Sequence, residues 1–331
     1  MRRLAIKILV LVALAWGGWW WIATGGLQRG AAAWLEAQRD QGITAQAETW
    51  SRGGFPLRIA TTAQNTQWTD AQRNTSVQIP AATLSTPIYW PGDARIEMPE
   101  QAIILSTPQA EATLSLAGLD AQVQLHPGTS LQLEALSSES GAVSLDLVEG
   151  RILALQSLQA EVQQGDNPST YTIDLTAMGL SVGSIVRQGL QLPATLPDMF
   201  EPVIADMTVT FDRPWDRSAL EASRPQPRVI QIEQITAIWG DIGASMTGDL
   251  TVDAAGVPTG TITVNLRNWQ QLFDLAMAGL DTVPQWAATA QLGLQSMSDS
   301  DGTLNLNVTI AQGQMRMGFF PLGPAPRLII R

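Results

Sequence analysis

The sequence predicts a mainly β protein in which an antiparallel, amphipathic sheet follows an N-terminal transmembrane helix, with a small helical insert. Residues 4–23 form an apolar stretch whose only charge is Lys7. Beyond residue 42, apolar and polar residues alternate in many short segments. Strict alternation gives each strand one apolar and one polar face. One solvated face is typical of antiparallel rather than parallel sheets.

Residues 4–23 are long enough to cross a bilayer, because about 20 apolar residues of helix span its hydrocarbon core. Arg2 and Arg3 precede them, which favours a cytoplasmic N-terminus, and three tryptophans end the stretch where an aromatic belt would meet the outer headgroups. We therefore predict a membrane anchor over residues 1–25. Its anchor residues are Leu4, Ile8, Leu11, Trp19, Trp20, Trp21 and Ile22.

The alternative is a cleaved signal peptide, with Ala23-Thr24-Gly25 as a small-x-small cleavage site. The apolar stretch is longer than a usual signal core, and bulky tryptophans lie close before this site. Both interpretations export the rest of the chain. We predict a single-pass inner-membrane protein with most of its chain in the periplasm or, with a cleaved signal, a periplasmic protein.

The exported part is acidic and poor in reactive side chains. Residues 1–30 hold four basic residues and no acids, so the remaining 15 basic and 30 acidic residues give a net charge of −15. This charge argues against binding nucleic acid. No cysteine, one lysine and one histidine exclude a thiolate or multi-histidine metal site, a Schiff-base lysine and a P-loop. We predict no cofactor and no enzymatic activity; only carboxylate chemistry stays broadly open.

Four segments are predicted after the anchor. Residues 26–42 form a membrane-proximal helix that Gly42 ends. Two β-rich lobes cover residues 43–211 and 229–331. Between them, residues 212–228 form a boundary loop, because prolines and charges interrupt the strand pattern there.

The clearest hairpin lies in the second lobe, where the alternating runs 249–253 and 261–266 flank a Gly/Pro turn. Residues 303–310 alternate without a break. Period-two spacing puts each strand's apolar residues on one face. Burying one such side chain contributes about 1.5–3 kcal/mol, so protein or lipid must cover this face. The candidate apolar face consists of Leu250, Val252, Ile262, Val264, Leu266, Leu304, Leu306, Val308 and Ile310.

A small helical insert is predicted over about residues 268–297. Apolar residues at three- and four-residue spacing indicate a helix from Trp269 to Leu280, which we expect to lie against the apolar face. A second helix is predicted from Pro284 to Met297.

Two features contain residue types that act in catalysis in other proteins, namely a G-x-S-x-G motif and a histidine. Gly179-Leu180-Ser181-Val182-Gly183 matches the G-x-S-x-G nucleophile elbow, which needs a helix after the serine and a later histidine. Residues 187–189 give no clear helix pattern, and the only histidine, His126, precedes Ser181. We interpret the motif as a turn, and His126 as a solvated or capping residue before Pro127-Gly128.

Two groups of acids complete the candidates. Asp299 and Asp301 resemble the middle of a calcium loop, but the remaining ligand positions fall on Met297 and Val308, so a turn is predicted. Asp212 and Asp216 are a carboxylate pair of the kind that glycoside hydrolysis needs. The arginines between and beside them indicate a solvated charge cluster instead.

Three segments together resemble a family of Gram-negative, mainly alphaproteobacterial, proteins termed domain of unknown function 2125 (DUF2125). They are Gly54-Phe55-Pro56-Leu57-Arg58, a block over residues 239–269 that contains Gly248-Asp249-Leu250, and residues 320–326. The resemblance implies a single-anchor envelope protein and brings no catalytic residues. At fold level the chain also looks like the AsmA-type group, whose members are thought to form elongated sheets that carry lipid across the periplasm.

These observations favour a membrane-anchored cell-envelope protein with a non-enzymatic binding or scaffold role, in which the apolar sheet face binds or transfers lipid. Its expected partners are the membrane, lipid and other envelope proteins. One alternative is a structural subunit of an envelope complex whose core is closed and dry. The other is a carboxylate-dependent glycan hydrolase. A continuous apolar groove, a closed core and paired acids in a cleft would distinguish the three.

Overall fold

A computed structural model describes residues 2–37, 42–221, 223–278, 287–299, 301–318 and 320–330. Strands account for 54% of the chain, which confirms the predicted mainly β class. The chain divides into two compact units. The first unit contains Met1–Gln124 and Leu145–Val148, and the second contains Leu125–Ser144 and Glu149–Arg331.

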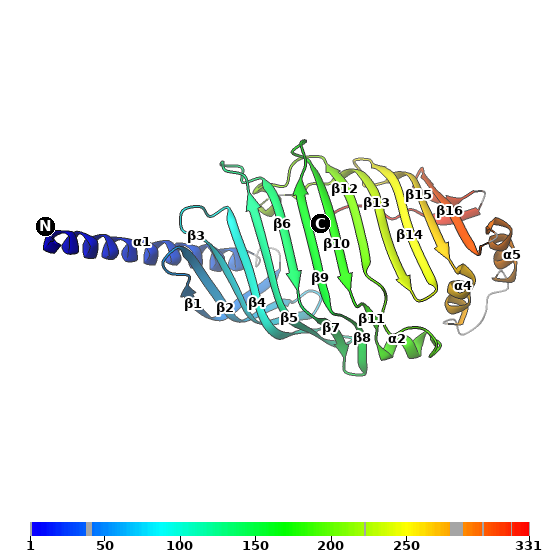
Figure 1. The fold of residues 1–331 in the computed structure, drawn as a ribbon, viewed down its shortest axis with the longest axis horizontal. Helices are drawn as coiled ribbons and strands as arrows, with labels where there is room; N and C mark the ends of the chain where they lie inside the picture. The colour runs from blue at the N-terminus through cyan, green and yellow to red at the C-terminus, as the bar shows by residue number, and fades with distance from the viewer. Residues whose placement is uncertain are drawn as a thin grey trace. The chain divides into compact units, whose positions relative to one another are not determined.

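The first unit is an antiparallel meander that follows one long helix in the chain (Figure 1). Each strand pairs with the next along the chain, so turns alternate between the two ends of the sheet. The elements are α1 (Arg2–Ala37), β1 (Ile43–Gly53), β2 (Arg58–Asp70), β3 (Thr75–Pro87), β4 (Asp93–Ser106) and β5 (Glu111–Leu125).

Helix α1 is continuous from Arg2 to Ala37, so the predicted anchor and membrane-proximal helix are one element. Residues 38–41, the predicted end of this helix, lie outside the described residues. Its segment Ile6–Ala37 is long and apolar enough to cross a membrane, a property that a membrane anchor shares with a signal sequence. The N-terminal half of α1 projects beyond the strands of its unit (Figure 1).

The C-terminal half of α1 packs on β1 and β2. Thr24 and Leu35 are buried there, as is Ala45 of β1. The Arg52 guanidinium stacks over Trp21 at 4.6 Å, and its Nε donates to Oε1 of Gln28 at 2.8 Å.

The second unit is a larger antiparallel sheet in which β6, β9, β10 and β12 to β16 lie side by side in that order, followed by β17 and β18 (Figure 1). The elements from residue 133 onward are β6 (Leu133–Ser140), β7 (Val143–Leu147), β8 (Gly150–Leu155), β9 (Ser157–Gln164), β10 (Thr170–Met178), β11 (Ser181–Val182), α2 (Ser184–Gly189), β12 (Val203–Phe211), α3 (Ser218–Glu221), β13 (Pro227–Trp239), β14 (Ile242–Val252), β15 (Pro258–Arg267), α4 (Trp269–Ala278), α5 (Ala287–Met297), β16 (Thr303–Ala311), β17 (Gln314–Met317) and β18 (Phe320–Pro324).

The hairpin expected around the Gly/Pro turn is β14–β15, and the insert contains α4 and α5. The predicted ends of the two insert helices, residues 279–286, lie outside the described residues. Residues 212–228, expected between two lobes, lie within the second unit, where the flanking strands β12 and β13 pair with each other. The expectation of no helix after Ser181 was wrong, because the short helix α2 follows it.

Candidate functional site

Cross-strand register lines up the apolar residues of the second unit in rows that run across its sheet. Ile262 of β15 lies opposite Val308 of β16, and Val264 lies opposite Leu306. A bulge in β13 keeps Ile232 and Ile235 on the same face although three positions separate them. Two adjacent rows, which we call the central rows, each cross eight strands. They are Leu136, Val162, Ile173, Met207, Ile232, Gly248, Ile262 and Val308, and Ser138, Ala160, Leu175, Ala205, Ile235, Met246, Val264 and Leu306.

The nine residues of the sequence-based apolar face share one face of β14, β15 and β16, but their burial differs with position. Leu304 and Ile310, near the two ends of β16, are 1% and 4% exposed. Leu306 and Val308, between them, are only partly buried. The same holds across the sheet, because every residue of the central rows is partly exposed. The face is therefore covered along its margins and open along its middle.

The margin at the Ile310 end of β16, which we call the first margin, is covered by an aromatic cluster. Tyr171 of β10 is 1% exposed and packs edge-on against Phe211, which in turn packs edge-on against Trp215. Ile330 and Val209 belong to the same cluster. The residues after β18 bring Ile330 to this position from the far end of the chain.

The C-terminal segment runs across the strand ends of this margin and is held by hydrogen bonds to three turns. The Ala325 N–H donates to the Gly313 carbonyl at 2.8 Å, and the Leu328 N–H donates to the Gly256 carbonyl at 2.8 Å. The Gln226 side chain accepts from the Ile330 N–H at 2.9 Å and donates to its carbonyl at 2.8 Å. Because the amide bonds both ways, Gln226 fixes the segment in register.

The margin at the Leu304 end of β16, which we call the second margin, is covered by residues around α4 and α5. Leu196, Trp239 and Ile242 form a buried cluster against which Leu275 of α4 packs. Trp269 is 2% exposed, and its indole N–H donates to Oγ of Ser298 at 3.1 Å. The first insert helix was expected to lie against the apolar face, and α4 contacts β14 with Leu275 packed against the cluster that contains Ile242.

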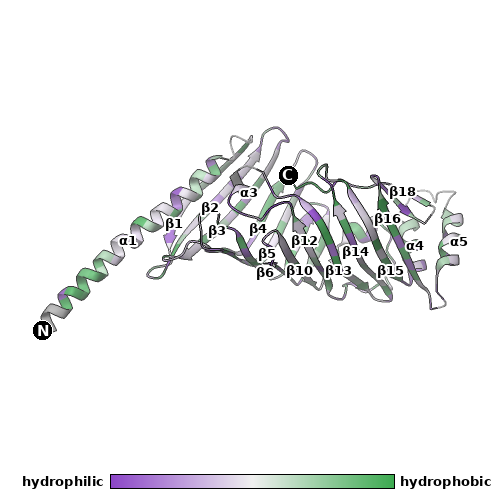
Figure 2. Cartoon of the chain, turned by 90° about the horizontal axis from the view of Figure 1, so that it is seen from above, coloured by the Kyte–Doolittle hydropathy of each residue, from purple (hydrophilic) through white to green (hydrophobic). Residues whose placement is uncertain are grey.

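The opposite face of the same strands is polar, as alternation requires. Thr263 donates to Asn307 at 3.0 Å, and Asn265 donates to Asn305 at 2.6 Å. Figure 2 shows hydrophobic residues on strands β12 to β16 and on the N-terminal part of α1. Neutral side chains bond one another on this face of β15 and β16, while Glu161, Asp174 and Asp206 lie side by side on the same face of β9, β10 and β12.

A polar network that the sequence did not reveal lies beside the first margin. Nε2 of His126 is 2.7 Å from Oε1 of Gln164, whose amide N–H donates to the Tyr171 hydroxyl at 3.2 Å. The Trp215 N–H donates to that hydroxyl at 3.1 Å. Burial, more than any other cause, raises the pKa of Tyr171 above its usual value of 10.0. His126 also lies 3.7 Å from the Glu134 carboxylate, so it has partners that its sequence context did not identify.

The residues singled out as possible nucleophile and acids each have local structural partners. Ser181 lies within β11 and its hydroxyl donates to the Ala154 carbonyl at 3.2 Å. Asp212 accepts from the Gln226 N–H at 2.9 Å, and Asp216 accepts from the Ser218 N–H at 2.9 Å before α3. Asp299 accepts from Asn305 at 3.0 Å in the turn before β16. Among the described residues, no three His, Cys, Asp or Glu side chains gather as a metal site.

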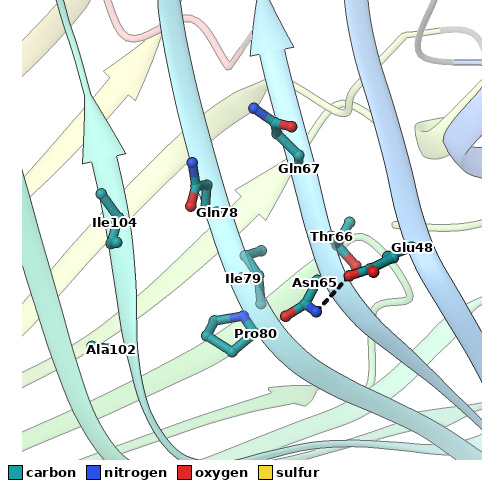
Figure 3. Close-up of a pocket in the computed structure, with 9 residues that line it drawn as sticks. All are labelled: Glu48, Asn65, Thr66, Gln67, Gln78, Ile79, Pro80, Ala102 and Ile104. Atoms are coloured by element: carbon teal, nitrogen blue, oxygen red, sulfur yellow. Dashed lines mark hydrogen bonds between the residues drawn. The ribbon is translucent and has the colours of Figure 1, made fainter.

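The first unit has a shallow hollow of about 400 Å³ on its sheet, where the β3–β4 register shifts (Figure 3). The pairing of β3 with β4 is interrupted around Pro80, and the Gln101 side chain bonds both the N–H and the carbonyl of Ala81 there. Glu48, the carboxylate in the lining, accepts from Asn65 at 2.7 Å. The lining otherwise consists of amides, one hydroxyl and apolar side chains, without the paired acids of a hydrolase.

Comparison with known proteins identifies the family. The chain matches the family model described as "Uncharacterized protein conserved in bacteria (DUF2125)" over residues 20–326. The match covers most of the chain, so the protein belongs to this family. No curated protein matches the sequence.

Proposed function

We propose that this member of the DUF2125 family is a single-pass, membrane-anchored protein of the cell envelope that binds lipid acyl chains along the central rows without catalysing a reaction. The observation that carries the proposal is the burial pattern of the second unit. Two partly exposed apolar rows lie between two well-covered margins. An apolar surface of this kind requires a cover.

The packing of α1 supports an anchor rather than a cleaved signal. Cleavage near Gly25 would remove Trp20, whose indole N–H donates to the Arg58 carbonyl at 2.7 Å. It would also remove Thr24, which is 0% exposed. A signal peptide is discarded and has no reason to pack on the mature domain, whereas an anchor that positions the domain does.

The dimensions of the central rows suit an acyl chain. Eight strands at about 4.8 Å spacing extend about 34 Å, which is about twice the hydrocarbon depth of one leaflet. Adjacent rows lie two residues apart along each strand, about 7 Å. The surface is therefore long and narrow, which matches an extended chain better than a globular protein.

The chemistry of the central rows also favours hydrocarbon. Their side chains are aliphatic or thioether groups, apart from Ser138 and the glycine at position 248, and none of them is ionisable. Met246 and Met207 supply flexible side chains that adapt to a ligand of variable shape. The nucleophile and acid candidates lie elsewhere and are engaged in local hydrogen bonds.

The test is native mass spectrometry of the detergent-extracted full chain, with Val264→Asp compared against Thr263→Asp. Val264 lies in a central row, whereas Thr263 is next to it on the polar face. We expect lipid on the wild type and on Thr263→Asp, and loss of lipid from Val264→Asp. Because Val264 is partly exposed, its replacement should leave a melting temperature within about 4 °C of the wild type.

Two outcomes would contradict lipid binding. A folded Val264→Asp that keeps its lipid would place the ligand elsewhere. A wild type that carries no lipid but co-purifies with a stoichiometric envelope protein, lost from Val264→Asp, would favour the structural-subunit alternative.

A further inference from the structure

Two turns lie together at one end of the sheet of the first unit. The β1–β2 turn covers residues 54–57 and the β3–β4 turn covers residues 88–92. They meet because Arg58 of β2 lies opposite Pro87 of β3. The Ile88 N–H donates to the Leu57 carbonyl at 3.0 Å, which joins the two turns directly.

These turns expose large apolar and aromatic side chains. Phe55 is 60% exposed, Leu57 is 65% exposed and Tyr89 is 81% exposed. At the opposite end of the same sheet, the β2–β3 turn is Ala-Gln-Arg-Asn over residues 71–74, and the β4–β5 turn is Thr-Pro-Gln-Ala over residues 107–110. The turns at one end of this sheet therefore expose apolar side chains, whereas the turns at the other end are polar, as surface turns usually are.

The apolar end lies against the part of α1 that carries the tryptophans. The Trp16 indole N–H donates to the Pro56 carbonyl at 2.9 Å. Trp20 packs edge-on against Phe55, with ring centroids 5.5 Å apart. Trp16 and Trp20 fall in the outer half of the apolar stretch of residues 4–23. A helix that crosses a bilayer there brings the two turns to the depth of the outer interface, where aromatic side chains are favoured.

We propose that Phe55, Leu57 and Tyr89 form a membrane-contact tip, which inserts into the outer-leaflet interface of the bilayer that α1 crosses. The inference rests on the proposed anchor. Phenylalanine and leucine supply apolar area for the acyl boundary, and tyrosine supplies a ring with a polar end for the headgroups. Arg52, exposed and stacked on Trp21, stands where its guanidinium meets lipid phosphates.

This tip gives the first unit two attachments to the bilayer in place of one. A single helix leaves a domain free to tilt about the point where it emerges. The tip adds a second contact beside that point, so the strands of the first unit stand end-on to the membrane. An exposed apolar end that would otherwise favour aggregation is then covered by lipid.

The test uses the absence of cysteine from the chain, because a single introduced cysteine then carries the only label. Leu57→Cys and Tyr89→Cys report on the two turns. Arg73→Cys and Gln109→Cys report on the polar end, and Leu14→Cys reports on the bilayer interior. Each full-length variant is labelled with an environment-sensitive fluorophore and placed in vesicles of phosphatidylethanolamine and phosphatidylglycerol, with or without brominated acyl chains.

We expect brominated lipid to reduce the emission at positions 14, 57 and 89 at least twofold, and to leave positions 73 and 109 within about a tenth of their unbrominated values. Quenching at position 14 without quenching at 57 and 89 would overturn the tip and leave the anchor intact. No quenching at position 14 would overturn the anchor and the tip with it. Equal quenching at both ends of the sheet would also contradict the tip, since it would mean that the whole unit lies flat on the membrane.

Discussion

Leu304 and Leu306 lie two residues apart on β16 and point to the same face of the sheet. Leu304 is 1% exposed, whereas Leu306 remains partly open. Their strand, chemistry and backbone pairing are alike, since each lies opposite an apolar residue of β15. The difference comes from what lies above them. Margin residues are buried within the fold, whereas central residues keep exposed surface, which is where we propose that a ligand binds.

The largest loss of stability should come from shortening a buried side chain in a margin of the apolar face. Leu304→Ala is expected to lower the free energy of unfolding by about 2–5 kcal/mol, because it leaves a cavity among fixed neighbours. Leu306→Ala should cost about 1 kcal/mol, because the side chain is only partly buried. Thermal unfolding of the detergent-solubilised variants, followed by circular dichroism, measures both. Equal losses would show that the two positions are covered alike and would remove the distinction.

An intermediate effect is expected where the C-terminal segment closes the first margin. Gln226→Ala removes both hydrogen bonds to Ile330 and should cost about 1–2 kcal/mol. Gln231→Ala, at an exposed position of β13, which begins directly after Gln226, is the control and should be within about 0.5 kcal/mol of wild type. If limited proteolysis releases the C-terminus no faster from Gln226→Ala than from Gln231→Ala, the segment is not held by this residue.

The smallest effect is a pH dependence at the buried margin. The pKa of Tyr171 is raised by burial, so the unfolded chain loses this proton at a lower pH than the folded protein does. The stabilisation is fully present below about pH 10 and is lost as the pH rises through the folded pKa. Melting curves from pH 8 to 11 should show this alkaline loss in the wild type and in Tyr89→Phe. Its persistence in Tyr171→Phe would assign it to another group.

Much of the second unit follows from local patterns. Eight alternating residues from Thr303 to Ile310 predict a strand and assign its faces, because successive side chains point to opposite sides whatever the surroundings. The Gly/Pro turn between β14 and β15 predicts the hairpin in the same way. Composition also limits the chemistry, since one lysine, one histidine and no cysteine leave few catalytic groups to combine.

Local patterns were less informative where the signal was short. The six residues of α2 follow a glycine-rich turn and carry too few positions for a helical period to show. The partners of His126, which follows β5, are Gln164 of β9 and Glu134 of β6, and no spacing rule connects these residues. The Phe55 turn was noted as a family-like segment, but nothing in its residues indicated that it lies against Trp16 and Trp20.

The sequence by itself determined the strands, their apolar faces and the long N-terminal helix, because each depends on the period of side chains along one short segment. Only the tertiary structure decided which parts of the apolar face are covered. The cover at one end of the sheet includes Ile330, more than 100 residues away from Val209 beneath it. At the other end it includes α4, whose Leu275 packs against the cluster of Leu196, Trp239 and Ile242. Burial depends on what packs from elsewhere in the chain, and that information is not present in the alternation of any one strand.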